Sequence, residues 1–189
     1  MGSRVFELGC GSGATADMLC AMGYSVTAVD PSTSGIEHAQ KSYAGPVFAQ
    51  RSAYDNLAGE FGTFSVVVSL EVIEHCYKPR HFVDSVHSLL VPGGVAVIST
   101  PYHGYLKNLA LALAGKFDDH WSPLWDGGHI KFWSERTLAA LLNERGFDDV
   151  VFVRVGRIPP FAKSMIAVAR KRSGPAARVV SGQNGTGAV

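Results

Sequence analysis

The stretch "VFELGCGSG", from Val5 to Gly13, joins a short apolar run to three glycines at alternate positions. Residues 14–22 follow with a helical composition, so the order is strand, tight turn and helix. Glycine lacks a Cβ, which lets such a turn approach a ligand closely, and the next helix offers unpaired N–H groups to an anion. The stretch therefore predicts a ligand-binding loop at the carboxyl end of a first strand.

The alternation of strands and helices continues through most of the chain. Further strands are predicted at residues 24–30, 47–50, 64–69, 95–100, 150–155 and 164–170. Helices are predicted at residues 34–42, 79–94 and 134–145, and Pro-Gly-Gly closes the second of them. Near-continuous apolar runs are typical of strands buried on both faces of a parallel sheet. The pattern predicts an α/β fold of the Rossmann-like, doubly wound type, with a mostly parallel seven-stranded sheet.

The composition fits a single domain. Of 189 residues, 47% are hydrophobic and 17% are charged, which is enough apolar chain for one sizeable core. The net charge of +1 shows no basic excess, so nucleic acid is not expected as a partner. The three cysteines form no CxxC pair, and no apolar run resembles a membrane span or signal peptide, so we expect a cytoplasmic location. We assign residues 1–171 to the domain and residues 172–189, rich in Gly and Ser, to a disordered tail.

Two acidic residues narrow the class of ligand. The glycines Gly9, Gly11 and Gly13 give the spacing GxGxG, whereas a dinucleotide site has GxGxxG. Glu7 would repel a pyrophosphate but can pair with an ammonium group, directly or through water. Asp30, at the end of the second predicted strand, can bind a ribose diol. An amino acid joined to a nucleoside meets both requirements.

At these residues the chain resembles the class I S-adenosylmethionine-dependent methyltransferases, and the resemblance extends from about Val5 to Arg170. It rests on the motifs "ELGCGSG", Asp30, "FSVVVSLEVIEH" and "LLVPGGVAVIST". In that family the glycine loop holds the methionine part of the cofactor, the acid after the second strand holds the ribose, and residues after the third strand contact adenine. The cofactor-binding residues that the resemblance implies are Glu7, Gly9, Cys10, Gly11, Gly13, Asp30, Pro31, Ser52, Ala53, Leu70 and Glu71.

The chain departs from the family pattern in two places. The adenine contact is often a Gly-Asp pair, and this chain has "QRSAYD" in that region, so the acidic contact is missing or moved. Family members also carry one or two helices before the first strand that help to cover the cofactor, and this sequence begins almost at the strand. We therefore expect weak cofactor affinity unless another segment replaces those helices.

The sequence "EVIEH", from Glu71 to His75, offers a way for an acceptor hydroxyl to lose its proton. If this stretch is helical, Glu71, Glu74 and His75 lie on one face at i, i+3 and i+4. Two carboxylates and an imidazole can hold a divalent ion. His129, in "DGGHIKFWS", is a candidate fourth ligand.

The same motifs resemble two metal-using branches of the family, the ubiquinone-pathway O-methyltransferases and the small-RNA 2'-O-methyltransferases. By that resemblance, Glu71, Glu74, His75 and His129 would hold Mg²⁺ or another divalent cation, which would lower the pKa of the acceptor. In related methyltransferases without a metal, the Glu and the His merely line the site. Glu74, His75 and His129 are therefore candidate catalytic residues, and either histidine is a candidate base if no metal binds.

An insertion between the fifth strand and the last helix carries Leu106, Leu109, Ala110 and Leu113 at helical spacing, and Trp121 adds aromatic surface. Three interpretations of this predicted helix stay open. It packs its apolar face on the domain, it closes over the substrate as a lid, or it contacts a membrane surface peripherally. The candidate residues of the acceptor pocket are Tyr102, His103 and Trp125. Ubiquinone-type enzymes carry an apolar insertion at this point, which favours a phenolic or lipid-linked acceptor, and a sugar diol is equally compatible.

The sequence thus predicts an S-adenosylmethionine-dependent O-methyltransferase that acts on a phenol or diol. Three alternatives stay open, namely a small-RNA 2'-O-methyltransferase, an N- or C-methyltransferase that uses no ion, and a non-catalytic binding protein with the cofactor fold. The balance of 17 basic and 16 acidic residues argues against the first, because RNA binding calls for a basic surface. Loss of activity with a chelator would argue against the second, and failure to bind cofactor would identify the third.

Overall fold

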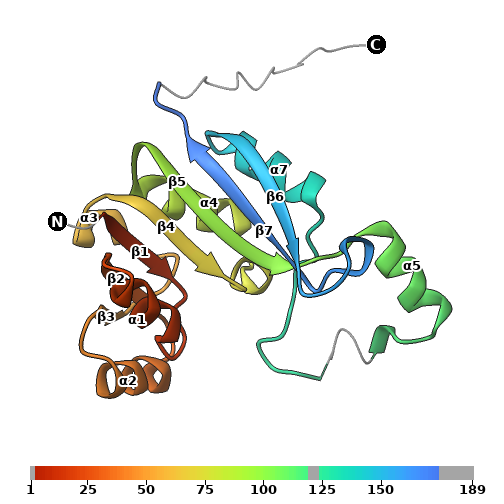
Figure 1. The fold of residues 1–189 in the computed structure, drawn as a ribbon, viewed down its shortest axis with the longest axis horizontal. Helices are drawn as coiled ribbons and strands as arrows, with labels where there is room; N and C mark the ends of the chain where they lie inside the picture. Colours follow the sequence, from red (N-terminus) through yellow and green to blue (C-terminus); the bar gives the residue numbers. More distant parts are fainter. Residues whose placement is uncertain (1–2, 119–123, 175–189) are drawn as a thin grey trace, which may run out of the picture.

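The structure is a computed structural model that describes residues 3–118 and 124–174 of the 189-residue chain. The described residues form a seven-stranded sheet in the order β3-β2-β1-β4-β5-β7-β6 (Figure 1). The strands from β3 to β5 pair in parallel, and β7 runs antiparallel to both of its neighbours. The predicted α/β fold with a doubly wound, mostly parallel sheet is confirmed, and its strand order reverses between β1 and β4.

Each of the seven predicted strands is present. The strands are β1 (Arg4–Leu8), β2 (Ser25–Asp30), β3 (Val47–Gln50), β4 (Phe64–Leu70), β5 (Leu90–Pro101), β6 (Phe147–Val155) and β7 (Ser164–Lys171). The helices are α1 (Ala14–Ala21), α2 (Thr33–Ser42), α3 (Leu57–Phe61), α4 (Pro79–Leu89), α5 (Tyr105–Leu113) and α7 (Glu135–Glu144), with 3₁₀ turns η1 (Ile73–His75) and η2 (Pro159–Phe161). The sequence pattern misses α3, because a helix this short shows too little apolar periodicity to be recognised.

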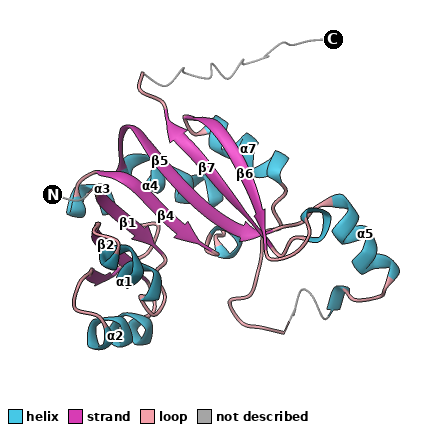
Figure 2. Ribbon diagram, viewed as in Figure 1, coloured by secondary structure: helices cyan, strands magenta, loops and turns pink. Residues whose placement is uncertain are grey.

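Helices cover both faces of the sheet, and each face buries its own apolar cluster (Figure 2). The helices α1 and α2 lie over the first cluster, which includes Val26 and Ile36. The helices α3, α4 and α7 lie over the second and larger cluster, which includes Phe6, Phe64 and Phe82. Right-handed crossovers that leave the centre of the sheet in opposite directions place their helices on opposite faces, and this gives the three layers.

Local signals in the sequence set where the helices begin. Pro79 occupies the first turn of α4, where its missing N–H costs no hydrogen bond. Ser32 caps α2 by accepting the N–H of Gly35 at 3.1 Å. Ser134 caps α7 in a capping box with Thr137. These caps satisfy N–H groups at helix ends that would otherwise lack partners.

The helix predicted at residues 79–94 is shorter than expected. It ends at Leu89, and the Pro-Gly-Gly sequence at 92–94 already lies within β5. The pairing of β4 with β5 shifts register between Phe64 and Val66, which marks an irregularity at this point. Pro-Gly-Gly therefore interrupts the start of a strand and does not close the helix.

Exposed apolar side chains include those of the helix α5 and of the edge strand β6. The helix α5 projects beyond the carboxyl ends of the parallel strands (Figure 1), and it buries none of its residues, its leucines included. The leucines Leu106, Leu109 and Leu113 of the predicted apolar face are therefore not packed on the domain. On the edge strand β6, Val151 and Val153 are exposed on the face away from α7.

The described chain continues past the predicted domain boundary. Arg172 donates its backbone N–H to the carbonyl of Gly146 at 3.0 Å and pairs with Asp148 at 2.7 Å, so this first residue of the predicted tail belongs to the folded domain. Residues 175–189 of that tail, like Trp121, lie outside the described residues. No helix within 3–118 and 124–174 is long and apolar enough to cross a membrane.

Candidate active site

A cavity of about 490 Å³ opens at the carboxyl ends of β1 and β4, where the strand order reverses. Loops that follow β1, β2 and β4 form its walls. The lining residues are Glu7, Gly9, Cys10, Gly11, Ser12, Ala14, Thr15, Asp30, Pro31, Leu70, Glu71, Val72 and His75. Doubly wound sheets bind ligands at this position. All the predicted cofactor-binding residues lie around this one cavity except Gly13, Ser52 and Ala53.

The three glycines of the loop have positive φ angles and different surroundings. At Gly9 (φ 85°) a Cβ would collide with Val72, so glycine lets the loops after β1 and β4 approach each other. At Gly11 (φ 52°) a Cβ would meet no other atom. At Gly13 (φ 87°) a Cβ would lie 2.7 Å from the ring of Phe48. Gly13 therefore serves the packing of α1 against the sheet and does not line the cavity.

Asp30 ends β2 and ties the glycine loop to the next loop. Its Oδ2 accepts the N–H of Gly11 at 2.9 Å, and its Oδ1 accepts the N–H of Ser32 at 2.8 Å. These two bonds fix the orientation of the carboxylate and leave further lone pairs on each oxygen. The carboxylate can therefore accept both hydroxyl protons of a diol in the cavity.

Glu7 contributes a buried carboxylate to the same cavity. The residue is 2% exposed, and its Oε2 has no hydrogen-bond partner among the described residues. Desolvation raises the pKa of Glu7 to about 7, and hydrogen bonds from Ala16 and Thr15 oppose that rise. Because a buried carboxylate without a full set of partners is unfavourable, this position suits a cationic ligand group.

A smaller cavity of about 180 Å³ adjoins the first, and Gly9, Pro31, Val72 and His75 line both. Its other lining residues are Leu8, Arg51, Ser52, Ala53, Tyr54 and Cys76, which include the two residues predicted to contact adenine. The acidic residue of the "QRSAYD" stretch is Asp55. Its Oδ2 accepts the backbone N–H of Ser52 at 2.8 Å, so this carboxylate forms a hydrogen bond within its own loop.

The chain after β4 does not form the helix on which the predicted face of Glu71, Glu74 and His75 depends, so that prediction is wrong. Glu71 has a φ of 55° and turns back toward β5. Its N–H donates to the carbonyl of Ser99 at 3.2 Å, and its Oε1 accepts the Ser99 hydroxyl at 2.7 Å. The short turn η1 follows and carries Glu74 and His75.

The segment 127–131 brings His129 beside η1. The carbonyl of Glu74 accepts two backbone N–H groups of this segment, at 2.9 Å and 3.0 Å. One ligand atom each from Glu74, His75 and His129 lies within 4.8 Å of the others, and the two imidazole centroids are 4.9 Å apart. Three of the four predicted metal ligands thus form a group, and Glu71 lies outside it.

The hydrogen bonds of His75 define which ring nitrogen carries the proton. Its Nδ1 lies 2.7 Å from the carbonyl oxygen of Gly127 and 3.2 Å from that of Gly128. A carbonyl can only accept, so Nδ1 is the donor, and in the neutral ring Nε2 keeps a lone pair for an ion or a proton. Burial lowers the pKa of His129, and the neighbouring His75 lowers it further, so this ring is neutral near pH 7.

Glu74 is fully buried, and neither of its carboxylate oxygens forms a well-aligned hydrogen bond in the described parts of the chain, although the Thr100 hydroxyl and the Glu71 carboxyl lie near it. Desolvation raises its pKa to about 7, and the charge of Glu71 acts in the same direction. A buried carboxylate beside two imidazoles is an environment that a divalent cation would stabilise.

The three candidate acceptor residues lie in different environments. Tyr102 is buried in the larger apolar cluster, with the guanidinium of Arg154 4.7 Å from its ring, so its side chain belongs to the core. His103 lines a third cavity, of about 520 Å³, beside α5. Trp125 is exposed, and its ring lies 5.9 Å from the rings of both site histidines.

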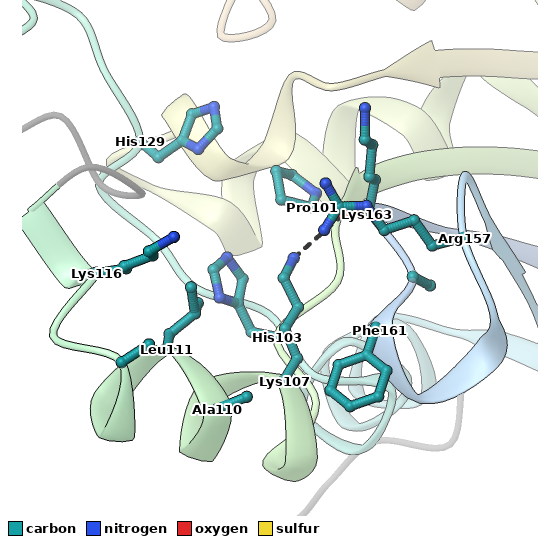
Figure 3. Close-up of a pocket in the computed structure, with 12 residues that line it drawn as sticks. Pro101, His103, Lys107, Ala110, Leu111, Lys116, His129, Arg157, Phe161 and Lys163 are labelled. Carbon is teal, nitrogen blue, oxygen red and sulfur yellow. Dashed lines mark hydrogen bonds between the residues drawn. The ribbon is translucent and has the colours of Figure 1, made fainter.

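This third cavity contains residues that sequence reasoning missed. His129 forms part of its wall, so the cavity adjoins the histidine pair (Figure 3). Lys107, Arg157 and Lys163 also line it. They share no motif, because α5 and the connection between β6 and β7 meet only in the folded chain. The one signal in the sequence is Lys107 itself, a basic residue within the leucine-rich predicted helix.

The doubly wound sheet, the glycine loop at its switch point and the acid at the end of β2 define a protein of the class I methyltransferase type. Residues 1–151 match the family described as Methyltransferase domain. The match covers most of the chain, so the chain belongs to this family, and the predicted class is confirmed.

Individual relatives agree with this assignment. The chain is 34% identical over 161 residues to a ubiquinone biosynthesis O-methyltransferase of Methylocella silvestris, a match that covers 80% of this chain and 62% of that protein. It is 35% identical over 127 residues to the protein of the same name from a Caulobacter species, covering 65% and 50% of the two chains. The chain thus spans 62% or less of the length of these two relatives. An S-adenosylmethionine dependent methyltransferase from Mesorhizobium loti has the same fold, with a TM-score of 0.72, 17% identity, and coverage of 90% of this chain and 91% of that one.

Proposed function

We propose that this chain binds S-adenosylmethionine and transfers its methyl group to a hydroxyl oxygen. The observation that carries the proposal is the continuity of the site. His75 lines both cavities at the glycine loop, and its ring lies against that of His129, which lines the third cavity. A donor in the first cavity and a hydroxyl in the third would meet at the two histidines. Methyl transfer requires in-line approach, and positioning of this kind supplies much of the acceleration.

Separate groups would orient the parts of the cofactor. The Asp30 carboxylate would accept the ribose hydroxyls, and the adenine would enter the smaller cavity beside Ser52 and Ala53. Glu7 would pair with the α-ammonium group, which gives its buried carboxylate a partner. The open space at Gly11 would admit the methionine part close to the backbone.

The transfer breaks the bond between sulfur and the methyl carbon, whose electron pair stays on sulfur, and forms a bond between that carbon and the acceptor oxygen. The hydroxyl proton has to leave as this bond forms. In the route without a metal, Nε2 of His75 or a ring nitrogen of His129 accepts it.

A divalent cation is the second element of the proposal. Glu74, His75 and His129 would hold it, and it would act as a Lewis acid that lowers the pKa of the acceptor hydroxyl. The residues present fit such an ion, because the Glu74 oxygens are buried without well-aligned hydrogen bonds in the described residues and the backbone contact of His75 uses the other ring nitrogen. One carboxylate and two imidazoles favour a first-row transition ion over Mg²⁺, which prefers oxygen ligands.

The acceptor that we propose is a small or lipid-linked phenol or diol. Both relatives described above are named for O-methylation in ubiquinone biosynthesis. The third cavity has apolar walls from Ala110, Leu111 and Phe161, which suit an aromatic or aliphatic body. The exposed leucines of α5 would lie along an apolar tail or contact a membrane surface peripherally.

Binding and turnover test the two parts of the proposal separately. Titration calorimetry should show that the parent protein and Glu74→Gln bind S-adenosylmethionine. Asp30→Ala should give no binding heat. With catechol as a model acceptor, Glu74→Gln and a chelator should each abolish turnover. Absence of heat at millimolar cofactor contradicts the proposal, and turnover that survives both treatments contradicts the metal and favours the histidine base.

A further inference from the structure

We propose that the third cavity, between α5 and the β6–β7 connection, binds a phosphate group carried by the methyl acceptor. This inference rests on the proposed function, because it assigns the cavity to the acceptor. It adds a substrate class that the relatives' names do not contain.

The charge of the cavity wall is one-sided. Lys107 comes from α5, Lys116 follows that helix, Arg157 follows β6, and Lys163 precedes β7. In the part of the chain that the structure describes, the wall includes no acidic residue. Figure 3 shows Lys107, Arg157 and Lys163 gathered on one side, with Lys116 across from them. A cavity lined by several cations attracts a multiply charged anion.

Lys107 is the fixed centre of this group. Its Nζ donates to the carbonyl of Tyr102 at 2.8 Å and lies 3.5 Å from the carbonyl of Lys163. Burial lowers the pKa of Lys107, the charge of Arg157 lowers it further, and the charge of Glu71 opposes both. A half-buried ammonium beside a guanidinium is unfavourable by itself, and an anion bound between them would stabilise both charges.

The cations of the cavity lack the partners that arginines have elsewhere in the molecule. Five arginines form ion pairs with carboxylates, and these are Arg51, Arg80, Arg145, Arg154 and Arg172. Within residues 3–118 and 124–174, Lys107, Lys116, Arg157 and Lys163 form none. No carboxylate of the described residues therefore neutralises these four charges, although Lys107 already donates to backbone carbonyls.

A phosphate matches this wall better than a carboxylate does. It carries up to two charges and three acceptor oxygens, and an arginine can bind it through two parallel hydrogen bonds. The remaining wall is apolar, from residues that include Leu111 and Phe161, so the phosphate would belong to a larger molecule. His129 also lines this cavity, which would direct the rest of that molecule toward the histidine pair (Figure 3).

Titration calorimetry with phenyl phosphate tests the cavity directly, since binding does not depend on methyl transfer. We expect phenyl phosphate to bind near neutral pH with an affinity that decreases as the salt concentration rises. Benzoate should bind more weakly, and phenol should give no binding heat. Lys107→Met and Arg157→Ala should each weaken phenyl phosphate about tenfold or more while S-adenosylmethionine affinity stays unchanged. Two matched controls outside the cavity, Lys41→Met on α2 and Arg80→Ala on α4, should bind phenyl phosphate as the parent protein does.

The outcomes separate this inference from the proposed function. If S-adenosylmethionine binds and phenyl phosphate does not, the phosphate site is overturned and the methyltransferase proposal stands. If phenyl phosphate binds and Lys107→Met and Arg157→Ala weaken it, the site stands even where the cofactor fails to bind. Equal affinity of benzoate assigns the cavity to carboxylates and overturns the inference. Sedimentation with phosphatidylglycerol vesicles, without any response to phenyl phosphate or inorganic phosphate, would identify a membrane surface and also overturn it.

Discussion

The carbonyl of Glu74 accepts the N–H of Ile130 at 2.9 Å, and this bond joins the two segments that carry His75 and His129. The bond uses the backbone alone, so a change in the Glu74 side chain leaves it in place. The fold that brings the histidines together and the chemistry of the three side chains can therefore be tested separately.

His129→Ala should abolish metal binding and leave the fold intact. We expect Zn²⁺ or Mn²⁺ to raise the melting temperature of chelator-treated protein by a few degrees, because an ion that binds only the native state stabilises it by mass action. His129→Ala and Glu74→Gln should remove this shift. His38→Ala, at an exposed position of α2, is the matched control and should retain it. The same shift in all variants would locate the ion elsewhere and contradict the proposed ligand set.

Asp30→Asn should weaken S-adenosylmethionine by about 10- to 100-fold, because the charged acceptor of the ribose hydroxyls becomes neutral. Calorimetry of the cofactor measures this change. The substitution also weakens the bond from Gly11, so thermal unfolding has to be measured alongside. Asp148→Asn, on the distant strand β6, should change cofactor affinity little. A normal dissociation constant for Asp30→Asn would show that the ribose lies elsewhere.

The affinity for S-adenosylmethionine should fall as the pH decreases below about 7. Desolvation raises the pKa of Glu7 from 4.5 to about 7 in the free protein, so at lower pH the carboxyl is protonated and cannot pair with the ammonium group. The dissociation constant should increase up to about tenfold per pH unit below that value, while the cofactor's α-amino group stays protonated. Calorimetry from about pH 5 to pH 7 checks this, and Glu7→Gln should flatten the profile.

The raised pKa of Glu7 also determines the direction in which the stability of the free protein changes with pH. A carboxyl whose pKa is higher in the native state binds protons there that the unfolded chain releases. The contribution of Glu7 to the free energy of unfolding is therefore largest below pH 4.5 and decreases as the pH rises toward about 7. Glu7→Gln should remove this decrease, and thermal unfolding of both proteins across that range measures it. An unchanged pH dependence in Glu7→Gln would assign the effect to another group.

The sequence predicts the sheet and the cofactor loop because their signals are local. An apolar run that ends in glycines specifies a strand and a tight turn, and Asp30 ends the next strand at a position that parallel pairing brings to the same edge. The role of Gly13 is not local, because Phe48, which packs against it, belongs to a different strand. Spacing alone could not separate this glycine from Gly11.

The site beyond the cofactor loop could be predicted only in part. The i, i+3, i+4 spacing of Glu71, Glu74 and His75 assumes a helix, whereas Glu71 has a left-handed backbone conformation, and its N–H and its carboxylate both hydrogen-bond to the Ser99 hydroxyl. The cations of the third cavity come from segments that the antiparallel pairing of β5 with β7 places together. Such groupings depend on tertiary contacts, and a single sequence contains no signal for them.

Gly13→Ala should mainly reduce stability, whereas Gly11→Ala should mainly weaken cofactor binding. At Gly13 an added Cβ would lie 2.7 Å from the buried ring of Phe48 and 2.8 Å from Ala39, in a left-handed conformation that by itself costs about 1–2 kcal/mol. We expect a loss of about 2–4 kcal/mol in the free energy of unfolding, because the packed side chains around Gly13 have no room to move away from the added methyl group.

At Gly11 no atom lies within 4 Å of the added Cβ, so only the cost of the backbone conformation remains. Gly11→Ala should nevertheless weaken S-adenosylmethionine about tenfold or more, since its Cβ enters the space for the methionine part. Urea unfolding and calorimetry on both variants distinguish the two roles, and a stable Gly13→Ala with weakened cofactor would mean that Gly13 faces the ligand after all.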